Sequence, residues 1–263
     1  MIDVTLVVPM FNRPRTLEKI LKALDIQTFP HDRFEAIFVD DSGPESYHIQ
    51  KAILDAAPPK CAWTYLTTGL PREIFGVTVA RNKAIRAARG SVIVFMDDDC
   101  VPNPHHLEQH WLAHAADPWL TAIGNRSEDV SFLTAVPPIP ILRDKCRTEA
   151  ARSAKGGLGA GSFITSNASA KRQHLLDAGL FDESFAQPGE YGYEDRDLGD
   201  RLLKLGAVLR FLRDAAVWIA PKESNPWAGR LEEAKGAGHA RYKAKHPKSV
   251  VRKVVKWLKG KKP

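Results

Sequence analysis

The sequence predicts an α/β fold, with a mainly parallel sheet that helices cover on both faces. Apolar, β-branched segments alternate with segments of helical periodicity through the first half of the chain. Two of the apolar segments end in acidic turns, at residues 40–41 and 97–99, and ligands bind at such strand ends in open α/β sheets. The 263 residues are 44% hydrophobic and 26% charged, which is enough apolar material for the core of one such domain.

Each element of the first half is predicted from its apolar pattern and from the residues that bound it. Strands are expected at residues 4–9, 34–39, 63–66, 91–96 and 120–124. Helices are expected at residues 14–24, 45–56, 77–88 and 104–115. Pro14 stands at the first position of its helix, and Gly90 follows the third helix as a C-cap type of residue.

The second half is less regular. Residues 135–160 contain three prolines and the pair Gly156-Gly157, so this segment is predicted to be rich in loops. Helices are expected at residues 171–178 and 194–205, and a strand near residues 215–219. No linker divides the first 233 residues, which we therefore expect to form one domain. Near residue 124 the regular alternation of strands and helices gives way to the less regular second half. Residues 234–263 are expected to form a basic helical C-terminal tail.

The net charge of +7 comes from this tail. Residues 234–263 hold eleven Lys or Arg and no acid, whereas the first 233 residues hold 27 basic and 31 acidic residues. A nucleic-acid-binding fold would carry its positive charge on its main face, so no nucleic-acid partner is expected. Apolar residues recur at helical spacing in residues 245–262 and predict a basic amphipathic helix, which can lie on an anionic membrane surface. The alternative is a helix that packs on the domain or a solvated end.

Cysteine usage and hydropathy indicate the compartment. Cys61, Cys100 and Cys146 are too few and too widely spaced for a disulfide framework or a Cys-x-x-Cys metal site. No secretory signal and no apolar stretch of about 18 residues is present. We expect a cytoplasmic protein, peripheral on the inner face of the cytoplasmic membrane if the tail binds there.

The triplet Asp97-Asp98-Asp99 is the sharpest local feature. Three adjacent carboxylates at the end of a buried strand repel one another unless a cation compensates them. Oxygen ligands suit Mg²⁺ or Mn²⁺, which also binds substrate phosphates. The alternative, which a triplet by itself favours, is a solvated acidic turn.

Two further acidic pairs are candidates for chemistry. Asp41, which follows Asp40 at a strand end, can accept hydrogen bonds from a nucleotide's ribose or base, or can belong to a turn. Glu194-Asp195 opens a helix, where acids are stabilised by the helix dipole. The pair can also supply a general base aimed at an acceptor hydroxyl, with Tyr191 and Tyr193 as a stacking surface for a sugar ring.

Taken together, the motifs resemble the family 2 glycosyltransferases, which are inverting enzymes with the GT-A fold, built on a Rossmann-like sheet. The motifs of the first half are VVPMFNR at residues 7–13, FVDDS at 38–42, ARNKAI at 80–85 and FMDDD at 95–99. Those of the second half are GAGS at 159–162, AGLFDE at 178–183 and EDRDL at 194–198, and they are also similar to the C-terminal part of β-galactosyltransferases. The resemblance covers about residues 3–220.

The resemblance implies a nucleotide-binding half at about residues 1–124 and an acceptor-binding half at about residues 125–233. It implies that the donor is bound by Pro9, Asn12, Arg13, Asp41, Arg81, Asp97, Asp98, Gly161 and Ser162. It makes Asp99 and Asp97 the ligands of Mn²⁺ or Mg²⁺, and Asp195, with Glu194 as the second choice, the catalytic base. The expected reaction moves a sugar from a nucleotide diphosphate donor, most often a UDP-sugar, to a hydroxyl of a glycan or lipid-linked saccharide.

One departure from the family pattern concerns the metal. Relatives supply a His near the strand at residues 215–219, where this chain reads Val217-Trp218-Ile219-Ala220-Pro221. His239 and His246 come later and at a different spacing.

Two alternative functions stay open: a non-catalytic nucleotide-sugar-binding or membrane-docking protein, and a sugar-phosphate nucleotidyltransferase. The second would be expected to carry a Gly-rich phosphate loop after the first strand, and this chain has none.

Overall fold

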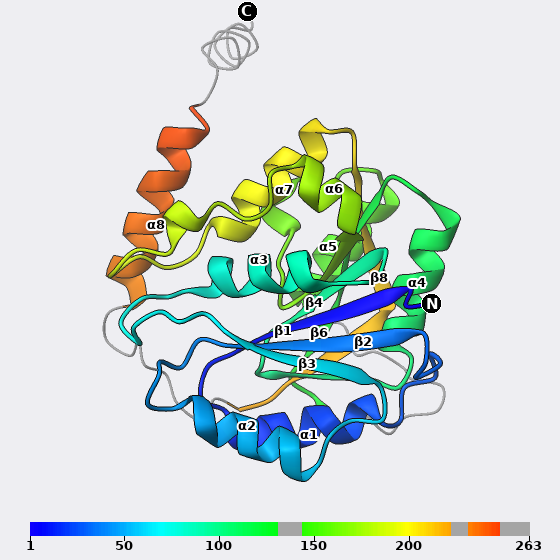
Figure 1. Ribbon diagram of the computed structural model, residues 1–263. Helices are drawn as coiled ribbons and strands as arrows, with labels where there is room; N and C mark the ends of the chain where they lie inside the picture. Colours follow the sequence, from blue (N-terminus) through cyan, green and yellow to red (C-terminus); the bar gives the residue numbers. More distant parts are fainter. Residues whose placement is uncertain (131–143, 222–230, 248–263) are drawn as a thin grey trace, which may run out of the picture.

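The computed structural model describes residues 1–130, 144–221 and 231–247, and shows an eight-stranded sheet between two layers of helices (Figure 1). The strand order is β3-β2-β1-β4-β7-β6-β8-β5. This architecture confirms the predicted α/β class. The segments at residues 131–143, 222–230 and 248–263, which include most of the predicted tail helix, lie outside the described residues.

The first half forms the parallel part of the sheet, as predicted. Its strands are β1 (Val4–Met10), β2 (Phe34–Asp40), β3 (Ala62–Thr67) and β4 (Val92–Met96). Its helices are α1 (Pro14–Leu24), α2 (Tyr47–Ala56) and α3 (Val77–Ala87). β1 pairs in parallel with both β2 and β4, so the loops that follow β1 and β4 emerge side by side. Ligands bind at this kind of position in doubly wound folds.

The second half extends the sheet with mixed pairing. Its strands are β5 (Cys100–Pro102), β6 (Leu120–Ser127), β7 (Asn167–Lys171) and β8 (Val208–Ile219). Its helices are α4 (His106–Ala116), α5 (Asp144–Ala154), α6 (Arg172–Asp177) and α7 (Glu194–Lys204). β7 runs antiparallel to both β4 and β6, whereas β6 and β8 are parallel. The later strands are therefore joined to the parallel part of the sheet through one antiparallel strand, β7.

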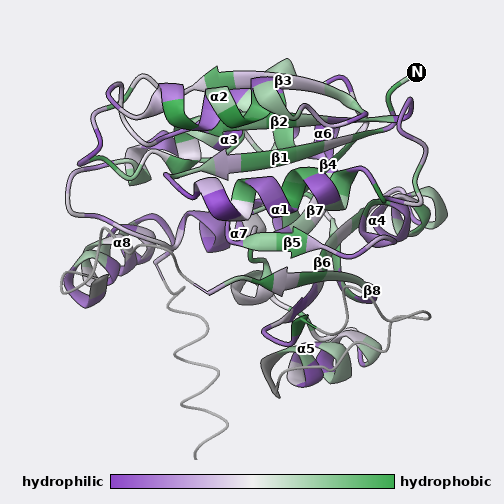
Figure 2. Cartoon of the chain, turned by 90° about the horizontal axis from the view of Figure 1, so that it is seen from below, coloured by the Kyte–Doolittle hydropathy of each residue, from purple (hydrophilic) through white to green (hydrophobic). Residues whose placement is uncertain are grey.

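Each face of the sheet packs on its own apolar layer. α1, α2 and α4 contribute to the cluster around Leu17, Leu54 and Leu107, while α3, α6 and α7 contribute to the cluster around Ile85 and Leu198. Figure 1 shows α1 and α2 on one side of the sheet and α3, α6 and α7 on the other. Seen from below in Figure 2, α1 carries hydrophilic and hydrophobic residues on different sides, as its sequence pattern requires.

Three elements differ from the prediction. β5 and β7 were not expected, because both are short and β7 reads Asn-Ala-Ser-Ala-Lys, without the β-branched residues that mark a strand. The segment at 135–160, predicted to be loop-rich, contains the eleven-residue helix α5. Its prolines precede the helix and its glycines follow it. A buried ion pair between Arg126 of β6 and Glu149, 3.2 Å, fastens this helix to the sheet.

The last described helix, α8 (Leu231–Lys245), packs on the domain. It begins before the expected tail boundary at residue 234 and contacts α7. The first third of the predicted tail therefore belongs to the folded body. Among the described residues, no helix is long and apolar enough to cross a membrane. Cys61, Cys100 and Cys146 are all buried and free.

Candidate active site

The acidic triplet after β4 meets the loop after β1. Asp98, the middle residue, is buried and accepts a hydrogen bond from the backbone N–H of Phe11 at 2.6 Å. Arg13 Nη1 donates to Asp98 Oδ1 at 2.9 Å. Burial raises the pKa of Asp98 to about 7. The structure therefore places Asp98, expected among the donor-binding residues, in contacts that join the two loops.

The outer members of the triplet are the more accessible ones. The side chains of Asp97 and Asp99 are 35% and 20% exposed, against 11% for Asp98. Asp99 Oδ2 lies 3.0 Å from Arg13 Nη1, and Asp97 Oδ1 lies 3.0 Å from Arg81 Nη2. Burial raises the pKa of Asp97. Two arginines thus offset part of the negative charge of the triplet that the sequence assigns to a metal ion.

Arg81 connects the nucleotide half to the acceptor half. It lies on α3, is almost fully buried, and its Nη1 contacts Glu194 Oε1 at 3.2 Å and Asp195 Oδ1 at 3.1 Å. Its Nη2 holds Asp97. One guanidinium therefore brings together carboxylates that are almost a hundred residues apart. The resemblance predicts a donor-binding role for Arg81, and the structure shows that its side chain bridges the triplet and α7.

Glu194 and Asp195 differ in their surroundings. Glu194 is buried, and its burial and the charge of Asp195 raise its pKa to about 7. Asp195 is 20% exposed at the side chain and accepts hydrogen bonds from both polar groups of Thr165. Thr165 Oγ1 donates to Asp195 Oδ1 at 2.6 Å, and its backbone N–H donates to Oδ2 at 3.1 Å. Of the two acids, Asp195 is the one that a ligand can reach.

Asp41, expected at the nucleotide, is held inside the nucleotide half. Its Oδ1 accepts from Thr68 Oγ1 at 2.8 Å and its Oδ2 from the backbone N–H of Gly76 at 2.8 Å. Burial raises its pKa to about 7. A Cβ at Gly76 would come within 2.4 Å of Asp41 Oδ1, so this turn requires glycine. Asp41 therefore shapes the loop that leads into α3.

The remaining donor residues surround the same region. Pro9 lies in β1, and Asn12 adopts a left-handed φ of 51° in the loop that follows. Gly161 and Ser162 form a short 3-10 helix at Ala160–Ser162, against the start of α7. A Cβ on Gly161 would lie 3.8 Å from Arg196 Cζ. These residues come from two segments, β1 with the loop that follows it and the short helix before β7, and their binding roles stay predictions.

The two tyrosines before α7 pack on different aromatic residues. The Tyr191 ring lies 4.6 Å from that of Phe75, and the Tyr193 ring stacks on His239 at 4.6 Å. Tyr193 has a left-handed φ of 72° at the N-cap of α7. Their acceptor role stays a prediction.

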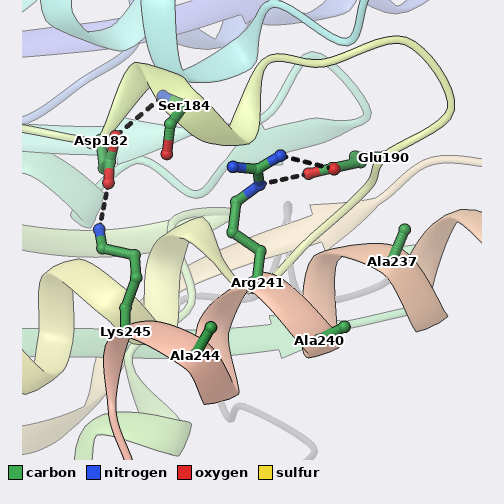
Figure 3. Close-up of a pocket in the computed structure, with 8 residues that line it drawn as sticks. All are labelled: Asp182, Ser184, Glu190, Ala237, Ala240, Arg241, Ala244 and Lys245. Atoms are coloured by element: carbon green, nitrogen blue, oxygen red, sulfur yellow. Dashed lines mark hydrogen bonds and ion pairs between the residues drawn. The ribbon is translucent and has the colours of Figure 1, made fainter.

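Helix α8 fastens the loop that carries these tyrosines. Arg241 forms two charge-assisted hydrogen bonds with Glu190, at 2.6 and 2.7 Å (Figure 3). Gly238 approaches the backbone so closely that an added Cβ would lie 2.6 Å from the carbonyl oxygen of Tyr191. Lys245, at the other end of the hollow in Figure 3, contacts Asp182. α8 is thus part of the wall of the acceptor half.

The donor set fits a divalent ion that is held only partly by protein. Among the described residues, no three His, Cys, Asp or Glu side chains gather as a metal cage. Asp97 and Asp99 offer carboxylate oxygens, and Mg²⁺ commonly uses one or two such ligands plus substrate phosphates. His239 stacks on the Tyr193 ring, and His246 Nε2 lies 2.8 Å from Asp197 Oδ1. Neither contact brings a histidine to the Asp97–Asp99 turn in place of the one that relatives supply near residues 215–219.

Residues 5–131 match the sequence model described as Glycosyl transferase family 2. This part of the chain, slightly less than half of its 263 residues, is therefore similar to the family 2 glycosyltransferases.

The chain is 27% identical over 256 residues to "Uncharacterized glycosyltransferase YfnE" of Bacillus subtilis (strain 168). That match covers 80% of this chain and 62% of YfnE, so the chain spans less than two thirds of this relative.

Two solved structures share its GT-A fold. S. aureus TarS 1-349 in complex with UDP is 16% identical, with a TM-score of 0.63 over 84% of this chain and 61% of that chain. The mannosyltransferase PcManGT from Pyrobaculum calidifontis, in complex with GDP-Man and Mn²⁺, is 21% identical, with a TM-score of 0.65 over 91% of this chain and 69% of that chain. TarS 1-349 also has a structure in complex with UDP-GlcNAc.

Several residues of the glycosyltransferase site were not found by sequence reasoning. Thr165, Thr68 and Gly76 hold the predicted acids through a hydroxyl or a backbone N–H. Threonine and glycine are common in loops, so their sequence positions carry no signal for these contacts.

Proposed function

We propose that this protein is a family 2 glycosyltransferase that moves a sugar from a nucleotide diphosphate donor to an acceptor hydroxyl, with inversion at the anomeric carbon. The observation that supports it is the position of Arg81, whose guanidinium contacts both Asp97 of the acidic triplet and Asp195 of α7. The candidate leaving-group site and the candidate base therefore lie on two sides of one side chain. An acceptor bound beside Arg81 would therefore lie within reach of both the donor and the base.

The ligands of similar solved structures indicate the class of donor. The similar structures hold UDP, UDP-GlcNAc and GDP-Man, all nucleoside diphosphates or their sugars. We propose a UDP-sugar as donor, with the nucleotide against the loops after β1 and β2. Arg13, Arg81 and the Asp97–Asp99 turn border the expected position of the diphosphate.

The proposed chemistry is a single displacement. The acceptor oxygen forms a bond to the anomeric carbon while the bond from that carbon to the β-phosphate oxygen breaks, and the electron pair leaves with the nucleoside diphosphate. Asp195 accepts the proton of the acceptor hydroxyl, because it is the more accessible of the two acids that open α7. Mn²⁺ or Mg²⁺ held by Asp99 and Asp97 would stabilise the charge that grows on the leaving phosphate. Arg81 keeps the carboxylates of both sides in place.

The acceptor is proposed to be a glycan or a lipid-linked saccharide. Tyr191, packed on Phe75, and Tyr193, stacked on His239, present ring surfaces beside Asp195, and aromatic rings commonly pack on sugar rings.

A thermal-shift screen of UDP, GDP and ADP, each with and without Mn²⁺, tests the donor site. A ligand that binds only the native state raises the melting temperature by mass action. We expect UDP to give the largest shift, and Mn²⁺ to enlarge it. A larger shift with GDP would change the donor nucleotide. No shift with any nucleotide would instead support the non-catalytic alternative.

We also propose that the basic tail binds an anionic membrane surface, where a lipid-linked acceptor would be found. The support is compositional, since residues 245–262 hold eight Lys or Arg spaced among apolar residues. Deleting residues 248–263 should abolish co-sedimentation with vesicles that contain phosphatidylglycerol. Equal co-sedimentation of both forms would contradict the proposal.

A further inference from the structure

The hydrogen bonds of Asp195 are unequally divided between its two oxygens. Oδ1 accepts from Thr165 Oγ1 at 2.6 Å and from Arg81 Nη1 at 3.1 Å. Among the residues that the structure describes, Oδ2 accepts only from the backbone N–H of Thr165, at 3.1 Å. A carboxylate oxygen has two lone pairs, so Oδ1 is fully used and Oδ2 keeps one lone pair.

We propose that Thr165 is the positioning residue of the catalytic base, and that it selects Oδ2 of Asp195 as the atom that accepts the acceptor's proton. The inference rests on the proposed function, in which Asp195 is the base. Thr165 contacts no reacting atom in this assignment. It acts through Asp195 by gripping both carboxylate oxygens from one residue.

Arg81 cannot hold Asp195 in this orientation by itself. The same Nη1 also contacts Glu194 at 3.2 Å, and Nη2 is engaged by Asp97 at 3.0 Å. Without the Thr165 hydroxyl, the carboxylate of Asp195 could rotate about χ2 toward the guanidinium. A partial rotation would bring the second oxygen toward Arg81, which would then use the lone pair that is otherwise free.

Thr165 has a rigid support. It is fully buried and lies two residues before Asn167, the first residue of β7. The Asn167 amide donates to two backbone carbonyls at 2.8 and 3.0 Å, so its Oδ1 must accept from ring N–H groups. His106 and His110 of α4 supply them at 3.0 and 3.1 Å. An amide with four hydrogen bonds fixes the start of the strand, and with it the position of Thr165.

The substitution Thr165→Val tests the proposal, because valine keeps the shape and the backbone N–H but lacks the hydroxyl. The assay is hydrolysis of UDP-GlcNAc and of GDP-Man with Mn²⁺, measured against pH, in which water takes the sugar in place of the acceptor and UDP or GDP is released. We expect kcat to fall about tenfold, with little change in the donor KM. The acid limb of the pH profile should move to higher pH, since losing a hydrogen bond to a carboxylate favours its protonated form. Thr165→Ser should restore most of both.

The matched control is Thr121→Val in β6, two strands from β4, which removes a buried hydroxyl that has no hydrogen-bond partner in the described parts of the chain. Nucleotide-induced melting shifts establish that each variant folds and binds donor. Wild-type kcat and pH profile in Thr165→Val, with Asp195→Asn inactive, would overturn the inference and leave the proposed function standing. Failure of Thr165→Ser to restore activity would also overturn it. Normal turnover by Asp195→Asn would instead remove the proposed base, and with it this role of Thr165.

Discussion

The two halves of the sheet treat their acids differently. In the nucleotide half, Asp41 and Asp98 are buried, and hydrogen bonds from neighbouring loops hold both oxygens of each. In the acceptor half, Asp195 is held just as firmly but remains partly exposed. Acids at strand ends can therefore serve to build the loops of a site, while the acid that we propose as the base is presented by a helix from the less regular half.

The sharpest test of this difference is Asp195→Asn. An amide cannot accept the acceptor's proton, so turnover should fall by about 10² to 10⁴. Donor-induced melting shifts should stay near wild type, because the substitution removes no proposed donor contact. The control on the same helix is Asp200→Asn, whose carboxylate accepts from Tyr242. Transfer above about a tenth of wild type would show that the accessible acid is not the base.

Acid should lower the free energy of unfolding through the buried His114 of α4. Burial lowers its pKa to about 3, so it stays neutral in the fold while the unfolded chain takes up a proton near pH 6.5. Its contribution is complete above pH 6.5 and is lost as pH falls toward 3. Relative to His114→Gln, wild type should lose about 2 kcal/mol of unfolding free energy between pH 7 and 5.

Urea denaturation of both proteins at the two pH values measures this loss. Taking the difference between proteins removes the contribution of the acids whose pKa is raised, which has the opposite sign. His48→Gln, at an exposed position on α2, is the control. An equal pH response of wild type and His114→Gln would show that the buried imidazole does not titrate as proposed.

In the nucleotide half, Asp99→Ala should weaken donor binding in the presence of Mn²⁺ about tenfold, because an accessible carboxylate is lost. Binding without Mn²⁺ should change less. Isothermal titration with UDP under both conditions measures the two affinities. An unchanged Mn²⁺ effect would remove Asp99 from the metal site and leave the triplet as a structural turn.

The smallest effect concerns the packing of α8 on the acceptor half. Gly238→Ala should cost about 1 kcal/mol, since the added Cβ would lie 2.6 Å from a carbonyl oxygen, and better helix propensity offsets part of the strain. Gly236→Ala, on the same helix with no atom within 4 Å of its Cβ, should stabilise by a similar amount. Denaturant midpoints give both values. Equal effects would show that α8 does not pack closely on the Tyr191 loop.

The amino-acid sequence by itself determined the α/β class, the four parallel strands of the nucleotide half and the position of α7. These features depend on local periodicity and turn chemistry, which a window of about ten residues contains. The same motifs located the acidic triplet and the Glu194-Asp195 pair, because carboxylate runs are visible without a structure.

Only the tertiary structure decided which acid is buried, which is accessible, and what holds each one. The strand β7, the helix α5 and the roles of Arg81 and Thr165 depend on contacts between residues far apart in the chain. A hydroxyl or a guanidinium acquires its role from the group it meets across the fold. Composition and spacing do not contain that information, whereas the packing of α3, α7 and β7 around one point does.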